Sequence, residues 1–415
     1  MTLRVALDVR IPAGAWGGIQ QMVEGLARGL SGLDGDGEYV FIGFDDAAEW
    51  LDPLLGGQCR RVEVERTHGR SLRRRAYDSV TGRIPGAAGL LAAVGGRLGR
   101  FATPVPTSDG FLESLGVDVV HFVAPQAYRT AVPSVYQLHD LLQEHLPDFF
   151  SPLHRRYRQV TYRAFADQAS IVSTMADWTR ADIVARLDQP RSKVAVVPLP
   201  PAVTPLTVEP RQPAARIPRG PFALYPAQTW PHKNHLALLD AMAVLRSRGS
   251  TLELVCTGRQ TEQYAAIARR VDALQLGEQV HFLGYVEQPE LGWLYEQATA
   301  LVFPTRFEGW GIPIVEAFAW GLPVACSAIP VLDEVAGAAA VRFDERDPIS
   351  IADALELIAN DAELRRRLIA AGQERVRPLT WDRYARTFRA LYRRAAGQPF
   401  SLEDTAHLMP PTLLS

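Results

Sequence analysis

Two glutamates stand eight positions apart around a short glycine loop in the C-terminal half of the chain. Glu308 precedes the loop, and Glu316 follows Pro313, whose fixed φ suits the first turn of a helix. An apolar run before the loop, a stop at Gly321 and a second apolar run predict a strand–loop–helix–strand unit with Glu316 on the first helical turn. N–H groups at a helix start have no intrahelical partner, and the helix dipole attracts anions there. The N–H groups predicted at this place are those of Gly309, Trp310, Gly311, Ile312 and Ile314.

Two carboxylates beside a phosphate would repel it, and this conflict restricts the ligand. The conflict disappears when each glutamate points away from the phosphates and accepts hydrogen bonds from hydroxyl groups. A molecule with hydroxyls on both sides of a diphosphate is a nucleotide sugar. The alternative is that Glu308 is an exposed loop charge and Glu316 a solvated helix residue, since acidic residues are favoured in a first turn. The glycines, the proline and the second glutamate exceed what capping needs, and they favour the nucleotide-sugar interpretation.

Residues 308–327, EGWGIPIVEAFAWGLPVACS, resemble the signature of the family 4 retaining glycosyltransferases of the GT-B fold. The two glutamates, the Gly-aromatic-Gly loop, the helix proline and the trailing Gly-x-Pro-Val all match. The resemblance implies an α/β fold with two doubly wound Rossmann-like domains that face each other across a cleft. It implies transfer of a hexose, with GDP-mannose favoured as donor, to an acceptor hydroxyl with retention of configuration, in polysaccharide or glycolipid synthesis. No metal or cofactor is expected, because the nucleoside-diphosphate sugar is a co-substrate.

Composition is typical of a globular protein with two domains. The chain has 415 residues, of which 47% are hydrophobic and 22% charged, and a net charge of -2 gives no reason to expect nucleic-acid binding. Three widely spaced cysteines form neither a disulfide framework nor a zinc motif. The N-terminal run is too short for a signal peptide, and no run of 18 apolar residues exists. The expected location is the cytoplasm, with at most peripheral attachment to the inner face of the cell membrane.

The N-terminus predicts the first strand, loop and helix of a doubly wound domain. Residues 3–7 form a short run that is apolar except for Arg4, and the loop at 11–18 ends in Gly17 and Gly18. Ligands of such sheets bind at the carboxyl ends of the strands, and in the resembling family this glycine loop faces the donor diphosphate. The alternative is a glycine turn without a ligand. The pair does not match G-x-G-x-x-G, so no NAD site is predicted.

Asp34, Gly35 and Asp36 form a D-x-D sequence. This spacing holds a divalent ion in metal-dependent glycosyltransferases of the other major fold. Asp and Gly also gather in turns for backbone reasons, and here they precede an apolar run. A solvated turn is therefore predicted instead of a metal site.

Dense prolines between residues 198 and 221 predict a linker between two domains, because they exclude continuous helix or sheet. A Rossmann-like acceptor-binding domain is expected over 1–200, and a Rossmann-like donor domain over 221–380. The resemblance implies that a last helix, 381–396, packs back on the first domain. Residues 398–415 are interpreted as a loose tail.

The segment 60–100 is rich in arginine and encloses the uncharged run IPGAAGLLAAVGG at 84–96. Arginines that flank an apolar stretch suit anionic lipid head groups or an acceptor that carries phosphate. The alternative is an excursion whose arginines are simply solvated. An anionic membrane surface is thus an expected partner, beside the nucleotide-sugar donor and a glycan or lipid-linked acceptor.

His139 follows the predicted strand 134–138 and opens the segment HDLLQEHLPDFF. It stands at the end of the strand where a doubly wound sheet binds its ligand. The alternative is a structural histidine. The segment is similar to one in many members of the resembling family, where the histidine reaches the donor sugar.

Residues 225–235, YPAQTWPHKNH, resemble the segment in which an arginine and a lysine hold the donor diphosphate. Lys233 matches the lysine, and its place near a helix start is disfavoured by the dipole unless an anion lies between them. An exposed lysine is the alternative. The arginine is missing, which leaves open a weaker clamp or replacement by Arg306 or another base. Residues 281–286 are interpreted as another strand end, and the resemblance implies that the turn there, with Tyr285 and Val286, reads the base through its backbone.

The resemblance implies a role for each of these residues. Glu308 holds hydroxyls of the transferred sugar and Glu316 holds the ribose diol, while Glu308, His139 and Lys233 form the catalytic set. Lys233 and the loop amides stabilise the charge of the departing nucleoside diphosphate. Three alternatives remain, namely an epimerase or hydrolase of nucleotide sugars, a phosphorylase with pyridoxal phosphate, and a non-catalytic sugar-nucleotide binding protein.

Overall fold

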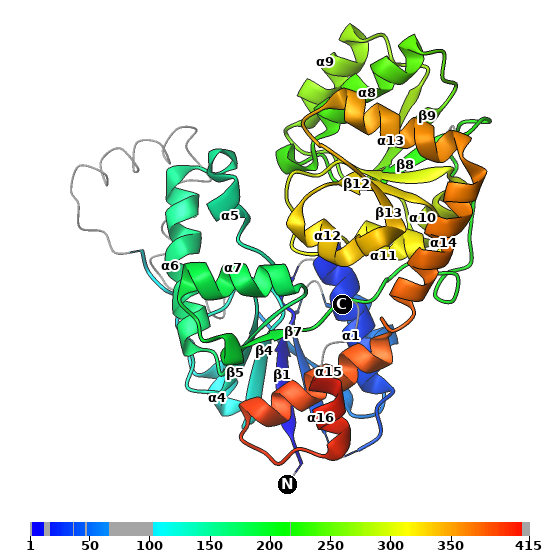
Figure 1. The fold of residues 1–415 in the computed structure, drawn as a ribbon. Helices are drawn as coiled ribbons and strands as arrows, with labels where there is room; N and C mark the ends of the chain where they lie inside the picture. Colours follow the sequence, from blue (N-terminus) through cyan, green and yellow to red (C-terminus); the bar gives the residue numbers. More distant parts are fainter. Residues whose placement is uncertain are drawn as a thin grey trace, which may run out of the picture. The chain divides into compact units, whose positions relative to one another are not determined.

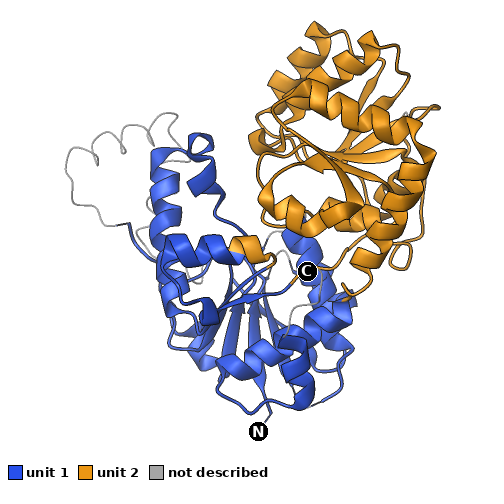
Figure 2. Ribbon diagram, in the orientation of Figure 1, with its two compact units in different colours: residues 1–174, 180–197, 381–409 blue, residues 175–179, 198–380, 410–415 orange. Residues whose placement is uncertain are grey.

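The computed structural model describes residues 2–11, 17–35, 37–45, 48–65, 103–215 and 217–408. These residues form two compact units (Figure 2). Unit 1 comprises residues 1–174, 180–197 and 381–409, and unit 2 comprises residues 175–179, 198–380 and 410–415. Each unit contains its own sheet, with buried strands and a hydrophobic core.

Within its described residues, unit 1 contains a parallel sheet of seven strands in the order β3-β2-β1-β4-β5-β6-β7. Figure 1 labels β1, β4, β5 and β7 of this sheet. The strands are β1 (Arg4–Asp8), β2 (Glu38–Phe44), β3 (Cys59–Val64), β4 (Val119–Phe122), β5 (Ser134–Gln137), β6 (Ile171–Thr174) and β7 (Val194–Val196). The chain winds outward from β1 to β3 and then outward from β4 to β7. Because crossovers between parallel strands are right-handed, helices cover both faces. The topological switch point of this sheet lies between β1 and β4.

Helices of two kinds surround this sheet. The α-helices are α1 (Gly18–Ser31), α4 (Phe111–Ser114), α5 (Leu142–His145), α6 (Pro152–Gln168), α7 (Asp177–Leu187), α15 (Trp381–Ala395) and α16 (Leu402–Leu408). The short 3₁₀ helices are η1 (Glu49–Leu54), η2 (Pro147–Phe149) and η3 (Arg191–Lys193). Alternate residues of β4 face opposite sides of the sheet. Val120 and Phe122 pack with Phe165 of α6 on one side, and His121 stacks on Phe388 of α15 on the other, with ring centres 4.7 Å apart.

Unit 2 contains a parallel sheet of six strands, again counted over described residues, in the order β10-β9-β8-β11-β12-β13. The strands are β8 (Phe222–Pro226), β9 (Glu253–Thr257), β10 (Val280–Gly284), β11 (Ala300–Phe303), β12 (Val324–Ser327) and β13 (Ala340–Phe343). Here the strand order reverses between β8 and β11. The two sheets give the predicted fold class, two doubly wound α/β units.

The helices of unit 2 connect these strands. They are η4 (Pro231–Lys233), α8 (His235–Ser247), α9 (Tyr264–Ala273), α10 (Gln288–Gln297), α11 (Ile312–Ala319), α12 (Pro330–Ala336), η5 (Gly337–Ala339), α13 (Pro348–Asn360) and α14 (Ala362–Val376). Helix α11 stops as predicted at Gly321, whose φ is 66°. The N–H of Leu322 then bonds the carbonyl of Ala317, and that of Gly321 the carbonyl of Phe318, which is a Schellman motif.

The predicted domain limits differ from the units at two places. Residues 175–179 belong to unit 2, because Glu334 accepts hydrogen bonds from the N–H groups of Asp177 and Trp178 at 2.6 and 2.8 Å. The predicted linker 198–221 also belongs to unit 2, and residues 198–201 are buried there. Within its described residues it contains neither helix nor strand, as dense prolines require.

Helix α15 belongs to unit 1 and lies against α1. Gly25 of α1 leaves room for the Trp381 ring, because a Cβ built on it would lie 2.3 Å from ring atoms. Buried hydrogen bonds join α15 to the sheet, since His121 contacts the Tyr392 hydroxyl at 2.8 Å and Gln137 contacts that of Tyr384 at 3.2 Å. Burial lowers the pKa of His121 to about 3, so this imidazole is neutral.

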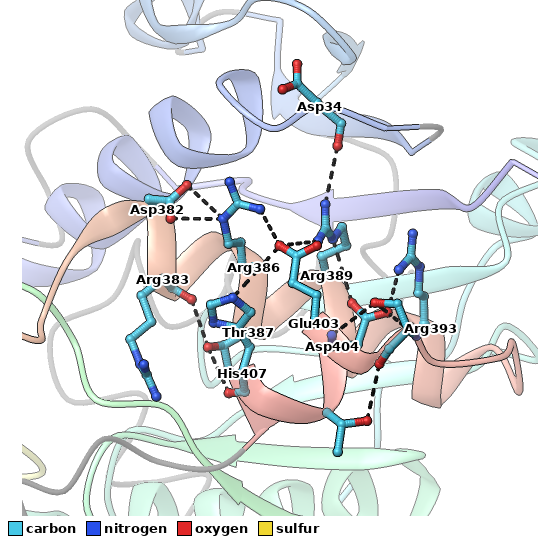
Figure 3. A network of polar contacts seen from close by, with 12 residues as sticks. Asp34, Asp382, Arg383, Arg386, Thr387, Arg389, Arg393, Glu403, Asp404 and His407 are labelled. Carbon is cyan, nitrogen blue, oxygen red and sulfur yellow. Dashed lines mark hydrogen bonds and ion pairs between the residues drawn. The ribbon is translucent and has the colours of Figure 1, made fainter.

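The predicted loose tail 398–415 is wrong for residues Leu402–Leu408, which form α16 against α15. Charges hold this helix (Figure 3): Arg393 lies 2.5 Å from Asp404, and Arg386 pairs with Glu403. Asp404 is completely buried, and it is the buried residue of α16. Residues 409–415 lie outside the described residues.

Candidate functional site

The switch point of the unit 2 sheet lies between β8 and β11, whose carboxyl ends lead into two loops. The loop after β8 covers residues 227–234, and the loop after β11 covers residues 304–311. Helices leave these strands toward opposite faces, and ligands of doubly wound sheets bind at this place. Lys233 lies on the first loop and Glu308 on the second.

A short turn positions Lys233. The 3₁₀ helix Pro231–Lys233 is followed by Asn234 in the left-handed region, at φ 61°, before α8 begins. The side chain of Asn234 donates to the carbonyl of Pro304 at 3.0 Å and to that of Glu345 at 2.7 Å. One asparagine thus ties the lysine loop to the glutamate loop.

The two loops bring Lys233 and Glu308 into direct contact. Nζ of Lys233 lies 2.5 Å from Oε1 of Glu308, and the side chains are 18% and 13% exposed. The ammonium also lies 5.6 Å from the centre of the Phe303 ring. Partial burial strengthens the attraction but removes hydration from both charges. A ligand that carries both phosphate and hydroxyls could replace each partner of this pair.

The glycine loop before α11 presents backbone N–H groups. Within the described residues, no acceptor is found for the N–H groups of Gly309, Trp310, Gly311 and Ile312. The prediction for Ile314 is wrong, because its N–H donates to the Gly311 carbonyl at 2.9 Å. Gly311 has a φ of 130°, which a side chain rarely adopts. The buried Trp310 anchors the loop, since Nε1 donates to the Leu199 carbonyl at 3.1 Å.

Glu316 is buried and lies in the second turn of α11, not in the first turn as predicted, because the helix begins at Ile312. Its Oε2 accepts from the Tyr295 hydroxyl at 2.8 Å, and its Oε1 accepts from the Val203 N–H at 3.1 Å. Burial raises the pKa of Glu316 to about 7, although the hydrogen bonds from Tyr295 and Val203 oppose the rise. The carboxyl therefore links three segments of unit 2.

Two arginines flank the lysine loop where the clamp arginine is missing. The carbonyl of Arg259 accepts from the Thr229 N–H at 3.2 Å, and the N–H of Arg306 donates to the His232 carbonyl at 2.8 Å. Both arginines are exposed. Their backbones thus place two further cations beside the loop of Lys233.

Tyr285 and Val286 lie in the turn between β10 and α10. The turn begins with Gly284 at φ 71°, whose carbonyl accepts from the Gly258 N–H at 2.7 Å. Tyr285 is 67% exposed, and Val286 is partly buried. These residues follow β10, which is two strands from the switch point.

The remaining predicted residues lie in unit 1. His139 follows β5, and its Nε2–H donates to the Val123 carbonyl at 2.9 Å. Burial lowers the pKa of His139, which leaves a neutral ring with an unprotonated Nδ1. Gly17 takes a φ of 47° at the start of α1, and Gly18 is the first residue of that helix. The same unit holds Asp34, which is exposed in the turn after α1, whereas Asp36 lies outside the described residues.

Sequence reasoning missed the residues that hold the site together. Asn234 carried a signal, since asparagine tolerates the left-handed conformation and ends a Pro-His-Lys turn. No sequence signal marked Tyr295, because a single tyrosine on a helix indicates no particular partner.

Most of the arginine-rich segment lies outside the described residues. Arg60 and Arg61 are exceptions, because they lie on β3 and pair with Glu38 and Asp52 at 2.8 Å. Among residues that the structure describes, no helix is long and apolar enough to span a bilayer. In the same residues, no group of three or more His, Cys, Asp or Glu side chains could hold a metal ion.

The sequence matches a known family and several characterised relatives. Residues 209–375 match the family "Glycosyl transferases group 1". O-antigen chain mannosyltransferase B of Escherichia coli is 26% identical over 272 residues, which cover 63% of this chain and 70% of the relative. O-antigen chain mannosyltransferase RfbU of Salmonella typhimurium is 38% identical over 130 residues, or 31% of this chain and 36% of the relative. This chain therefore spans about a third of RfbU.

Solved structures share the fold at low identity. Sucrose-phosphate synthase from Thermosynechococcus elongatus superposes with a TM-score of 0.67 at 19% identity, over 94% of this chain and 98% of that one. HepE of Anabaena, solved in complex with UDP-glucose, gives a TM-score of 0.67 at 14% identity, over 94% and 99%. This chain thus resembles the glycosyltransferases of the GT-B fold, through its group 1 region at residues 209–375 and through its two doubly wound units. Its relatives include mannosyltransferases of O-antigen synthesis.

Proposed function

We propose that this glycosyltransferase moves a hexose, preferably mannose from GDP-mannose, to a hydroxyl of a glycan or lipid-linked acceptor with retention of configuration. The names of two relatives, both mannosyltransferases that build O-antigen chains, support mannose and a cell-surface polysaccharide. The corresponding place of action is the cytoplasm, at the inner face of the cell membrane. The proposal includes no metal and no cofactor.

The pairing of Lys233 with Glu308 at the unit 2 switch point carries the proposal. A diphosphate would take the ammonium of Lys233 and so release the carboxylate of Glu308 to accept hydrogen bonds from sugar hydroxyls. Lysine is rare in this chain, since the sequence contains two among its 44 basic residues. One of them stands where the carboxyl ends of β8 and β11 converge.

The departing nucleoside diphosphate gains negative charge, and fixed donors lower the barrier to its departure. Lys233 would supply one charge, and the N–H groups of Gly309 to Ile312 would supply aligned dipoles at the start of α11. Such donors are already oriented before the substrate arrives. In this scheme, the leaving phosphate oxygen accepts the proton of the acceptor hydroxyl on the same face of the sugar, which retains the configuration.

His139 would act as a hydrogen-bond acceptor in this scheme and not as an acid. Its Nε2–H is engaged by the Val123 carbonyl, and its lowered pKa keeps Nδ1 unprotonated. An unprotonated ring nitrogen accepts a hydrogen bond from a sugar hydroxyl.

Glu316 would bind the ribose diol only after a rearrangement. Both of its oxygens accept hydrogen bonds, from Tyr295 and from the Val203 N–H. Release of the Val203 N–H would free Oε1 while the Tyr295 hydroxyl continues to orient the carboxyl. Gly17, Gly18, Tyr285 and Val286 remain predicted donor contacts.

The test is a thermal-shift series with GDP, UDP, ADP and dTDP sugars, followed by a transfer assay. A ligand at about 100 times its Kd stabilises the folded state by about 2.7 kcal/mol. We expect GDP-mannose to give the largest shift, and Lys233→Met to weaken its binding at least about tenfold, since a charge-assisted contact is lost. The control is Lys193→Met, because Lys193 is the other lysine and donates to the Asp167 carbonyl on the surface of unit 1.

Two outcomes would contradict the proposal. Equal donor binding by Lys233→Met and Lys193→Met would remove the pair from the donor site. Loss of donor at the same rate with and without a glycan extract as acceptor would indicate a hydrolase or epimerase instead of a transferase.

A further inference from the structure

The switch point of unit 1 carries a second polar cluster, which the donor scheme does not use. Asp8 ends β1, Arg10 follows two residues later, and Tyr128 lies in the loop after β4. Since β1 and β4 flank the reversal in strand order, these three residues occupy the position where doubly wound sheets bind ligands.

The local backbone directs Arg10 toward this cluster. The N–H of Ile11 donates to the Val9 carbonyl at 2.7 Å, which makes a three-residue turn centred on Arg10. Val9 and Ile11 are buried on either side of it. Their burial fixes the turn, so the position of the arginine does not depend on a ligand.

One edge of the Arg10 guanidinium is fully engaged. Nε donates to Oδ1 of Asp8 at 2.9 Å, and the adjacent terminal nitrogen donates to Oδ2 at 2.5 Å. The guanidinium carbon lies 5.1 Å from the centre of the Tyr128 ring, so the aromatic ring packs against the cation. Tyr128 in turn packs edge-on against Phe122 at 5.0 Å.

The opposite edge of the guanidinium is open with respect to the part of the chain that the structure describes. Among the described residues no acceptor is found for its remaining N–H groups, and the side chain keeps 13% of its surface exposed. A guanidinium presents its N–H groups in a fixed planar fork, so the open edge offers parallel donors at a set spacing. Asp8 and Tyr128 have already removed its rotational freedom.

The charges around Arg10 favour an uncharged ligand over an anion. Burial by itself would lower the pKa of Arg10, but the Asp8 carboxylate more than compensates and raises it, and Asp109 adds a smaller effect in the same direction. Two carboxylates thus act on one guanidinium. An incoming anion would meet this surplus of negative charge, whereas an uncharged hydroxyl would not.

The switch points of the two sheets carry similar groups of side chains. In unit 2, Lys233 pairs with Glu308 and lies over Phe303, and in unit 1, Arg10 pairs with Asp8 and lies over Tyr128. Each pair joins a cation to a carboxylate beside an aromatic ring at the carboxyl edge of a parallel sheet. The difference is that Arg10 engages both oxygens of Asp8, which leaves the other edge of the arginine as the donor to a ligand.

We propose that the open N–H edge of Arg10 binds hydroxyl oxygens of an uncharged sugar residue, which in the reaction proposed above is the acceptor. The identification of this sugar as the acceptor rests on the proposed function. The binding of a neutral sugar by Arg10 does not depend on it. Asp8 and Tyr128 are positioning residues, because they act on the ligand through Arg10.

The test is saturation-transfer NMR on the full chain with a panel of methyl glycosides, methyl α-mannoside first, and with mannose 6-phosphate as the anionic probe. We expect a signal from at least one neutral glycoside. Arg10→Lys should abolish it or weaken the affinity at least about tenfold, because lysine keeps the charge beside Asp8 but lacks the planar edge. Arg10→Met is the second variant. The control is Arg156→Met, since Arg156 is exposed on α6 and has no side-chain partner among the described residues.

Each result decides the inference. It is overturned if no neutral glycoside binds, if Arg10→Lys binds as wild type does, or if mannose 6-phosphate alone binds in an Arg10-dependent way. Donor binding measured on the same samples separates the two proposals. A Lys233→Met chain that loses GDP-mannose should still give the glycoside signal, and Arg10→Lys should still bind GDP-mannose.

Discussion

At the scale of single residues, burial sets the protonation of two of the predicted site residues, Glu316 and His139. It raises the pKa of Glu316 to about 7 and lowers the pKa of His139, because both side chains lose water in their charged forms. Burial thus favours the protonated form of the Glu316 carboxyl and the unprotonated form of the His139 imidazole. Both groups therefore tend toward neutrality at the same time.

This shift makes the stability of unit 2 depend on pH. In the unfolded chain Glu316 titrates near its ordinary value of 4.5, and in the folded chain it titrates near 7. Between these values the folded state binds more protons, so stability falls as pH rises through this window. As pH rises through this window, the wild type should lose unfolding free energy on the order of 3 kcal/mol, and Glu316→Gln should not show this loss.

The measurement is urea unfolding of wild type and Glu316→Gln at pH 5 and pH 7.5. The difference in unfolding free energy should shift in favour of the variant at the higher pH. Glu296→Gln is the control, because Glu296 is exposed on α10. A constant difference across the two pH values would show that Glu316 is ionised in the folded chain throughout.

At the scale of elements, α15 and α16 are held by different forces. Helix α15 buries Tyr384, Phe388 and Tyr392 completely, so apolar contact dominates its attachment. Helix α16 buries Asp404, while its Leu402 is 92% exposed. Ion pairs therefore keep α16 in place, and such pairs weaken with added salt in proportion to their exposure.

We predict that Arg393→Met releases α16 without unfolding unit 1. The variant removes the 2.5 Å partner of the Asp404 carboxylate, whose remaining contacts are Arg389 at 3.8 Å and two hydrogen bonds from Ser401. Removing one partner of a buried ion pair costs up to about 3–5 kcal/mol, and we expect this loss to undock the short helix. Hydrogen exchange should rise over Leu402–Leu408 alone.

The control for this variant is Arg377→Met. Arg377 pairs with Glu374 at 2.8 Å, but both side chains are largely exposed, and such pairs contribute little. Unchanged exchange in Arg393→Met would mean that α16 is held by contacts other than this ion pair.

At the scale of the whole molecule, the N-terminal part of the chain forms most of unit 1, the following part forms unit 2, and α15 returns to unit 1. The return depends on close contact between α1 and α15, where Gly25 and Gly29 face Trp381 and Ala385. A methyl group at Gly25 would lie 2.3 Å from the Trp381 ring. Small residues thus allow the last helix to complete the core of the first unit.

We predict that Gly25→Ala destabilises unit 1 by at least about 1–3 kcal/mol, because the added methyl forces the Trp381 ring away from α1. Calorimetry should show a lower melting temperature. The matched control is Gly32→Ala at the end of α1, where the nearest atom to the new Cβ would lie at 3.6 Å. Similar melting of the two variants would show that α15 adjusts without cost.

The fold class and the two loops that carry Lys233 and Glu308 were readable from the chain itself. Apolar residues recur with the periods of strands and helices, and local rules place Lys233 and Glu308 in loops and Pro313 in the first turn of a helix. The end of α11 at Gly321 followed from local rules for the same reason. These features depend on neighbours within a few residues.

Tertiary structure decided which partner each polar group finds. Glu316 meets Tyr295 and Val203, which lie 21 and 113 positions away, and Asp404 meets arginines of α15 that no periodicity points to. The short sequence Asp8-Val-Arg10 gave no sign of a site until β1 and β4 were seen to flank the reversal of the sheet. Such contacts follow from strand order and burial, which the whole chain determines and no short segment contains.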